Sequence, residues 1–244
     1  MRSFFDDYPR FFETSSVGAW PVRLALRHHA IIESNRGVLQ GARVFDLASH
    51  DGRWSFAALK AGAAYVTGIE VRTHLIEAAN DTLHAYGIPD TDFTFMQGDL
   101  NHALRAPVTC NVALCLGYFY HTLNHLALME YLASTGARHV ILDGMVEPGD
   151  ADVIRVYAEP VENDANGASS AGIHEGRILV GHPTVKVLLR MLEHHGYRGR
   201  VFDWTDLLAE RGIVADLTRP HSAANPVGDY ARGARATIIA ERVS

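Results

Sequence analysis

Three carboxylates of the chain stand at intervals that suit a nucleoside-binding site. Asp46 and Glu70 lie at the ends of two short apolar runs, and Asp99 follows a third. Glu70 stands 24 residues after Asp46, and an acidic residue at about this spacing can accept the hydroxyls of a ribose. Asp99 could then reach the amino group of an adenine. The spacing therefore predicts a nucleoside site at the place where three neighbouring strands end.

The turn after Asp46 indicates which kind of nucleoside. A dinucleotide site requires G-x-G-x-x-G, so that bare backbone can approach a pyrophosphate. Here Ala48 and His50 stand where glycine is expected, and Gly52 alone remains. A pyrophosphate would be crowded by these side chains. The turn favours a nucleoside without phosphate, and S-adenosylmethionine meets that requirement.

Candidate catalytic groups follow the next two apolar runs. His121 could act as a general base, because neutral imidazole is available near pH 7; capping or bonding within the following helix is an equally open role. Asp143 could orient His121, bind a sugar hydroxyl or hold Mg²⁺, although one carboxylate is not by itself a metal site. Tyr118 could pack beside the cofactor or take part in catalysis.

Aromatic and polar side chains elsewhere could contact a methyl acceptor. Two of them belong to the aromatic N-terminal segment, which either forms a lid or packs on the domain surface. Two more fall in the segment 144–182, which interrupts the strand–helix rhythm, and insertions of this kind commonly cover strand ends. The candidate acceptor-binding residues are Tyr8, Trp20, Tyr120, Tyr157 and His174.

Hydrophobic periodicity predicts the elements that position these residues. Apolar runs typical of strands alternate with i, i+3, i+4, i+7 patterns typical of helices, which predicts a doubly wound α/β sheet. Residues 1–37 are expected to form the aromatic lid and a first helix, and 38–244 a catalytic domain with its insertion. The expected strands are 43–47, 64–70, 93–97, 111–116, 139–142, 200–204 and 236–241, with two more in the insertion at 153–157 and 178–180.

The motifs taken in order resemble class I S-adenosylmethionine-dependent methyltransferases. The resemblance covers residues 40–242 and implies a Rossmann-like, seven-stranded sheet, mostly parallel with one antiparallel strand, with helices on both faces. It also implies S-adenosylmethionine as the cofactor and methyl transfer as the activity. The residues expected to bind the cofactor are Asp46, Ala48, Ser49, His50, Gly52, Glu70, Val71, Gly98, Asp99, Leu100 and Leu116.

A narrower resemblance concerns the acceptor side. The segments Leu116–His121, Glu162-Asn163 and Gly181–Thr184 are similar to the tRNA wobble-uridine carboxymethyltransferase group. A net charge of −6 argues against a nucleic-acid surface. We therefore expect O-methylation of a small polar acceptor such as a sugar hydroxyl. A tRNA-modifying alkyltransferase and a non-catalytic adenosyl-ligand-binding module are the alternatives.

Composition limits the setting of the protein. The 244 residues include 48% apolar and 20% charged side chains, which excludes a mainly disordered or fibrous chain. The chain contains no run of about 18 apolar residues that could cross a membrane, and no secretory signal follows Met1. We therefore expect a cytoplasmic protein that does not act on membranes. The sequence leaves open whether it forms a homodimer.

Overall fold

Seven strands form one sheet in the order β3-β2-β1-β4-β5-β9-β8. The computed structural model describes residues 3–14, 21–100, 108–161, 172–219, 222 and 224–243. Within this sheet β9 runs antiparallel to β5 and β8, and the other neighbours pair in parallel. The predicted Rossmann-like sheet with one antiparallel strand is thereby confirmed. The strands are β1 (Arg43–Leu47), β2 (Tyr65–Glu70), β3 (Phe93–Gln97), β4 (Val112–Leu116), β5 (His139–Met145), β8 (Tyr197–Val201) and β9 (Arg235–Arg242).

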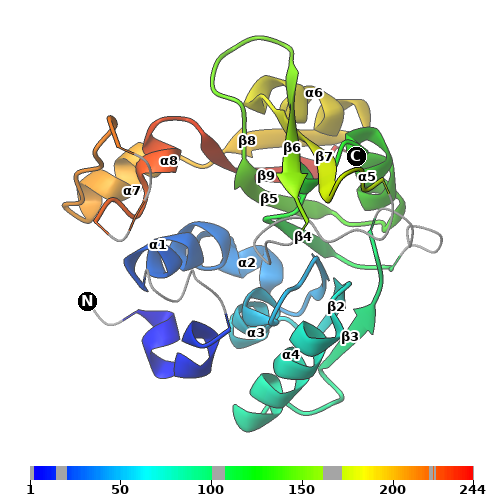
Figure 1. The fold of residues 1–244 in the computed structure, drawn as a ribbon. Helices are drawn as coiled ribbons and strands as arrows, with labels where there is room; N and C mark the ends of the chain where they lie inside the picture. Colours follow the sequence, from blue (N-terminus) through cyan, green and yellow to red (C-terminus); the bar gives the residue numbers. More distant parts are fainter. Residues whose placement is uncertain are drawn as a thin grey trace.

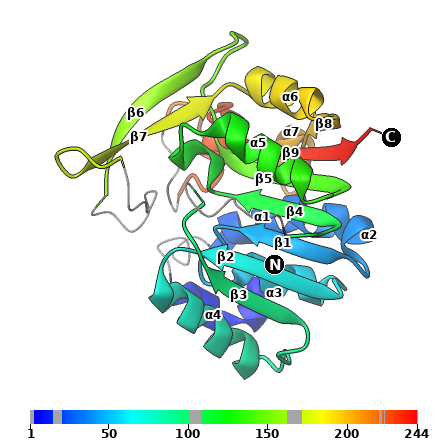
Figure 2. The same cartoon turned by 90° about the vertical axis from the view of Figure 1, so that its right-hand side faces the viewer.

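Helices cover both faces of the sheet, as Figures 1 and 2 show. The helices α1 to α4 gather on one face, and α5 and α6 lie on the other. Each face has its own apolar core: Val44 of β1 packs with the first group, and the adjacent Phe45 packs with the second. Alternate residues of one strand thus serve opposite layers. The helices are α1 (Pro21–Ile31), α2 (Arg36–Leu39), α3 (Arg53–Lys60), α4 (Thr73–Ala85), α5 (His125–Ser134), α6 (Val185–His194), α7 (Trp204–Glu210) and α8 (Gly228–Ala231).

A two-stranded hairpin interrupts the sheet after β5. Strands β6 (Ile154–Pro160) and β7 (Arg177–Pro183) pair antiparallel with each other and form a separate sheet. Figure 2 shows this hairpin projecting from the body of the molecule. It lies within the predicted insertion 144–182, except for its last residue. At its base, Gly181 packs closely against Leu123 and His125, so β7 lies against the segment that follows β4.

The described part of the aromatic N-terminal segment, residues 3–14, packs its rings against helices, and the hydroxyl of Thr14 donates a hydrogen bond to Asp51 in the turn after β1. Two short 3₁₀ helices, Phe4–Asp7 and Pro9–Phe12, contribute rings to the core beneath α3. The ring of Tyr8 lies 4.6 Å from that of Phe56 and 5.1 Å from that of Tyr86. Tyr8 therefore does not take the predicted acceptor-binding position, because its ring is packed between α3 and the end of α4. Trp20 lies outside the described residues.

The C-terminal part differs from the prediction at one strand. The run 200–204 was expected to be a strand, but β8 covers Tyr197–Val201, and Trp204 begins α7. Asp203 explains the change, because its carboxylate accepts hydrogen bonds from the backbone N–H groups of Thr205 and Asp206 and caps the helix. Among the described residues, no helix is long and apolar enough to cross a membrane.

Candidate functional site

The carboxyl ends of four parallel strands meet at one edge of the sheet. Strand β1 lies between β2 and β4, so Asp46 stands opposite Gly68 on one side and Leu114 on the other. Glu70, at the end of β2, stands opposite Gln97 of β3. The strand order reverses at β1, and ligands of open α/β sheets bind at such a switch point. The structure thus brings the predicted cofactor residues to the predicted place.

The turn between β1 and α3 has the backbone that glycines usually provide. Ala48 and His50 both have φ near 53°, and Gly52 has φ of 73°. The left-handed region costs a residue with a Cβ roughly 1–2 kcal/mol, so the turn holds Ala48 and His50 under strain. Strain of this kind concentrates where a ligand must be met. The turn thus adopts left-handed backbone at two positions that do not carry glycine.

Glu70 fixes this turn against β2. Its carboxylate accepts a hydrogen bond of 3.0 Å from the backbone N–H of His50, and two more from Val71 and Arg72 at 3.0 and 3.1 Å. The backbone N–H of Ser49 also donates to the carbonyl of Ile69 at 2.9 Å. The turn is consequently tied to the strand at which a ribose is expected.

Asp46 lies beneath the turn and is 1% exposed. Its Oδ2 accepts a hydrogen bond of 2.7 Å from the hydroxyl of Ser55 in the first turn of α3. Burial raises the pKa of Asp46 from 3.8 to about 7. This carboxyl group supports the turn from below, while Glu70 and Asp99 hold the outer positions of the predicted nucleoside site.

The remaining predicted cofactor residues border the same edge. Gly98 follows β3, and its backbone N–H donates to the carbonyl of Glu70 at 3.0 Å. Asp99 is half-buried, and Leu100 and Leu116 are buried. Val71 follows Glu70 directly. The predicted contacts of these residues with a cofactor remain predictions, but their positions suit a nucleoside lying across β1, β2 and β3.

His121 pairs with a glutamate from the hairpin. Its Nδ1 lies 2.8 Å from Oε2 of Glu159, and the two side chains are 9% and 19% exposed. An ionised carboxylate only accepts hydrogen bonds, so Nδ1 carries a proton, and in the neutral form of the ring Nε2 is then the nitrogen with the lone pair. The residues are 38 positions apart, and the packing of β7 near His125 brings them together. The pair has the arrangement of an oriented general base.

A row of rings extends from His121 to the exposed side of the hairpin. Tyr120 lies 4.1 Å from His121 and 5.6 Å from His182, whose ring lies 4.4 Å from that of Tyr157. Burial lowers the pKa of His182, and its buried Nε2 has no hydrogen-bond partner among the described residues. The structure thus gathers two of the predicted acceptor residues, Tyr120 and Tyr157, beside the candidate base.

The other candidates beside this row have different surroundings. Burial raises the pKa of Tyr118 well above its ordinary value, so its hydroxyl stays protonated at neutral pH and suits packing better than proton abstraction. His174 is exposed ahead of β7, where its backbone pairs with that of Arg177 at 2.9 and 3.0 Å. Acceptor binding by His174 remains a prediction.

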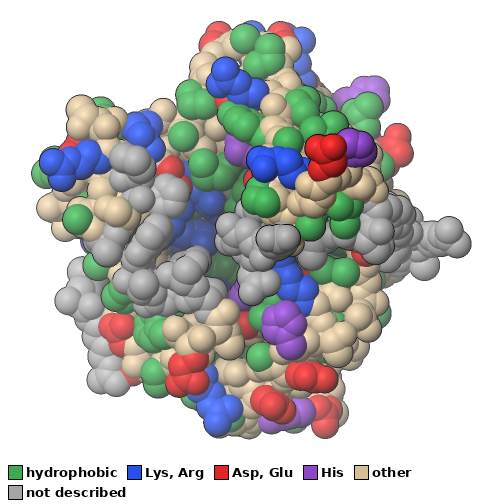
Figure 3. Space-filling view, viewed as in Figure 1, with side chains coloured by type: hydrophobic (Ala, Val, Ile, Leu, Met, Phe, Trp, Pro, Cys, Tyr) green, Lys and Arg blue, Asp and Glu red, His purple; other side chains and the backbone are tan. Residues whose placement is uncertain are grey.

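Asp143 is enclosed by hydrogen-bond donors. It lies in β5, is fully buried, and the surrounding positive charge holds its pKa well below the ordinary range. Figure 3 shows Lys or Arg side chains at the floor of a hollow on the face seen in Figure 1. The donors to Asp143 are Arg27 at 2.8 Å, Arg235 at 2.6 and 3.0 Å, Tyr230 at 2.7 Å and Thr237 at 2.7 Å.

This environment does not fit the predicted roles of Asp143. Both oxygens are occupied, so none is left to take a proton or to coordinate Mg²⁺, and its side chain does not orient His121. Among the described residues, no group of three His, Cys, Asp or Glu side chains could hold a metal ion. Asp143 instead neutralises two buried guanidinium groups that come from distant parts of the chain.

Sequence reasoning missed Glu159 as a partner of His121, and it missed the role of Arg27 and Arg235. Strand alternation could have placed Glu159 on the same face as Tyr157, two residues earlier. Nothing in the local sequence of Arg27 or Arg235 shows that they meet Asp143, because the three residues lie in three separate elements.

Comparisons with known proteins agree with this geometry. No protein-family model matches the sequence, and a comparison with curated proteins finds no match. The structure is similar to the N-terminal domain of EvdMO1, solved in the presence of SAH and D-fucose. The TM-score is 0.61 and the identity 16%, over 87% of this chain and 81% of that chain.

Two further solved structures show the same likeness. One is an S-adenosylmethionine-dependent methyltransferase from Mesorhizobium loti, with a TM-score of 0.57 and 17% identity over 86% of this chain and 96% of that chain. The other is magnesium protoporphyrin IX methyltransferase (ChlM) from Synechocystis PCC 6803 with bound SAH. Its TM-score is 0.53 at 17% identity, over 99% of this chain and 89% of that chain.

Proposed function

We propose that this chain, which has the class I S-adenosylmethionine-dependent methyltransferase fold, binds S-adenosylmethionine and transfers its methyl group. The observation that carries the proposal is the left-handed backbone at Ala48, His50 and Gly52, tied to Glu70 at the end of β2. It is supported by the structures of EvdMO1 and ChlM, which were solved with SAH.

The residues at the strand ends fit such a cofactor. The turn 48–52 would enclose the amino-acid part, Glu70 would accept hydrogen bonds from the ribose hydroxyls, and Asp99 would meet the adenine amino group. Leu100 and Leu116 would supply apolar contact for the adenine and for the region near the sulfur. When bound, the cofactor supplies an electrophilic methyl group on a sulfonium centre, and the chain has to align an acceptor with it.

The acceptor we infer is a small polar molecule with a hydroxyl group, such as a sugar. Such a hydroxyl must lose its proton during transfer, and Nε2 of His121 would take that proton while Glu159 holds the ring. Tyr120 and Tyr157 would flank the acceptor along the row of rings. The presence of D-fucose with the EvdMO1 domain supports a sugar acceptor.

The test has two stages. Calorimetry with S-adenosylhomocysteine should show binding to the wild-type chain, and absence of binding at millimolar ligand would sink the proposal. A transfer screen with labelled cofactor should then compare sugars, carboxylates, phenols and tRNA as acceptors. Labelled product with sugars is the expected result. Product with tRNA alone would replace the small-molecule reading, and cofactor binding with no product in any arm would favour a non-catalytic module.

A further inference from the structure

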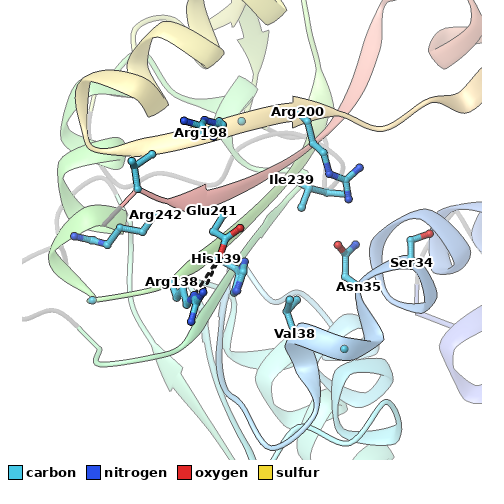
Figure 4. A pocket seen from close by; sticks show the side chains of 14 residues that line it. Ser34, Asn35, Val38, Arg138, His139, Arg198, Arg200, Ile239, Glu241 and Arg242 are labelled. Atoms are coloured by element: carbon cyan, nitrogen blue, oxygen red, sulfur yellow. Dashed lines mark hydrogen bonds and ion pairs between the residues drawn. The ribbon is translucent and has the colours of Figure 1, made fainter.

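A second concave site lies at the opposite end of the sheet from the turn 48–52. This groove of about 980 Å³ runs between strands β5, β9 and β8 and the segment 34–38. His139 begins β5, and Arg242 ends the antiparallel β9. Both residues therefore stand at the amino-terminal edge of the parallel strands (Figure 4). The groove is thus separate from the proposed cofactor and acceptor sites.

The groove concentrates positive charge in a chain whose net charge is −6. Four arginines and one carboxylate, Glu241, are among its lining residues, which gives 4 − 1 = +3. Arg138 pairs with Glu241 at 3.1 Å, so the excess belongs to the other three. Burial lowers the pKa of His139, so we count this ring as neutral.

Two of these three arginines, Arg198 and Arg200, share one face of the sheet. They are alternate residues of the edge strand β8, and side chains two positions apart in a strand point to the same face. Both are exposed, and no carboxylate pairs with either of them among the described residues. Figure 4 shows Arg200 reaching from β8 toward Asn35 and Ile239 across the groove.

Arg242 stands opposite Tyr197 in the pairing of β9 with β8, so its side chain points to the other face of the sheet from Arg198 and Arg200. Its guanidinium donates to the carbonyl oxygens of Ala133 and Ala137 at 2.6 and 3.2 Å, and to the hydroxyl of Tyr197 at 2.9 Å. All three acceptors are neutral. Its guanidinium also lies 5.0 Å over the ring of Tyr197, so the positive charge presented to a ligand in the groove is that of Arg198 and Arg200.

We propose that this groove binds a small ligand that carries two or more phosphate groups. Guanidinium groups match phosphate oxygens in bidentate geometry, and the volume lies within the range of small-molecule sites. Apart from His139, no aromatic side chain among the described residues lines the groove, so recognition rests on the phosphates rather than on a stacked base. A long nucleic acid is disfavoured, because the excess charge is confined to one groove of an acidic chain.

Calorimetry on the full chain with inorganic tripolyphosphate as the probe tests the proposal. Tripolyphosphate should bind, orthophosphate should bind far more weakly, and added salt should weaken both. R198A/R200A should weaken tripolyphosphate binding by at least roughly tenfold. The affinity of the R198A/R200A variant for S-adenosylhomocysteine should stay unchanged. This result would distinguish the groove from the proposed cofactor site.

The matched control is R155A/R190A. It removes two exposed arginines that already pair with Glu147 and Asp152, so net charge changes equally while the groove stays intact. Equal loss of binding in this control would show that only net charge matters and would overturn the proposal. Absence of tripolyphosphate binding would also overturn the proposal. Arg198 and Arg200 would then serve only to keep the edge strand β8 from pairing with another chain. If the chain bound single-stranded RNA more tightly than tripolyphosphate, and R198A/R200A weakened that binding, the groove would be a nucleic-acid surface instead.

Discussion

The backbone N–H of His50 donates a hydrogen bond of 3.0 Å to the carboxylate of Glu70. This bond joins the turn after β1 to the end of β2, the two segments that a nucleoside would bridge. One carboxylate therefore shapes the turn and also presents acceptors to the proposed ribose. Loss of that carboxylate should be felt in ligand binding.

Glu70→Ala should weaken binding of S-adenosylhomocysteine by at least roughly tenfold, because charged hydrogen bonds to the ribose are lost. Calorimetry measures the change, and Glu77→Ala serves as the control, because Glu77 is an exposed acidic residue of α4. Unchanged affinity in Glu70→Ala would refute the placement of the ribose.

Ala48→Gly should raise the free energy of unfolding by up to roughly 1 kcal/mol, because glycine relieves the left-handed strain and only part of the gain is lost to unfolded-chain entropy. Ala48→Val should lower it, since a β-branched residue fits this region poorly. Urea denaturation measures both. Equal stability of the two variants would mean that the turn carries no strain at this residue.

Asp143→Asn should lower the free energy of unfolding by roughly 3–5 kcal/mol, because Arg27 and Arg235 would remain buried without a counter-charge. Urea denaturation measures this loss. Asp152→Asn is the control, since Asp152 forms exposed ion pairs with Lys186 and Arg190 and should change little. A fully stable Asp143→Asn variant that lost methyl transfer would instead restore a catalytic role.

Asp46→Asn should stabilise the protein more at pH 8 than at pH 5. Burial raises the pKa of Asp46 from 3.8 to about 7. Between these two pH values the folded chain keeps a proton on Asp46 that the unfolded chain has released. The contribution of this group to the free energy of unfolding therefore falls as pH rises toward 7. Thermal unfolding across pH measures the difference. The exposed Asp81→Asn should show no such trend, and a pH-independent gain in Asp46→Asn would contradict the prediction.

Glu159→Ala should remove the preference of His121 for the tautomer with the proton on Nδ1. In the wild type the carboxylate holds the proton on Nδ1, and nitrogen-15 NMR of the ring should show unprotonated Nε2. Glu159→Ala should yield a mixture of tautomers, and Glu159→Gln should preserve part of the preference through its amide oxygen. With an acceptor in hand, kcat should fall while KM for the cofactor stays constant.

The control for this pair is Glu147→Gln, because Glu147 bonds Arg155 and Tyr157 but not His121. Its His121 spectrum should match that of the wild type. An identical tautomer in the wild type and in Glu159→Ala would remove Glu159 from the mechanism.

Local sequence patterns predicted the positions of several strands. Strands β1 and β3 begin and end where the sequence pattern places them. Strand β1 is buried at four of its five residues, whereas β3 is an edge strand in which only Phe93 is buried. The strand expected at 200–204 fails where the cap at Asp203 overrides an apolar run. Tyr8 fails for another reason: sequence shows that an aromatic segment needs partners, but not which helices supply them.

The sequence by itself determined the order of strands and helices, and with it the edge at which Asp46, Glu70 and Asp99 gather. When short strands and helices alternate along the chain, only a few topologies of a single sheet are possible. The tertiary structure decided which distant side chains meet. It joined His121 to Glu159, enclosed Asp143 between Arg27 and Arg235, and placed Arg198 and Arg200 in one groove with the segment 34–38. Contacts between such residues depend on packing across layers, which no local pattern encodes.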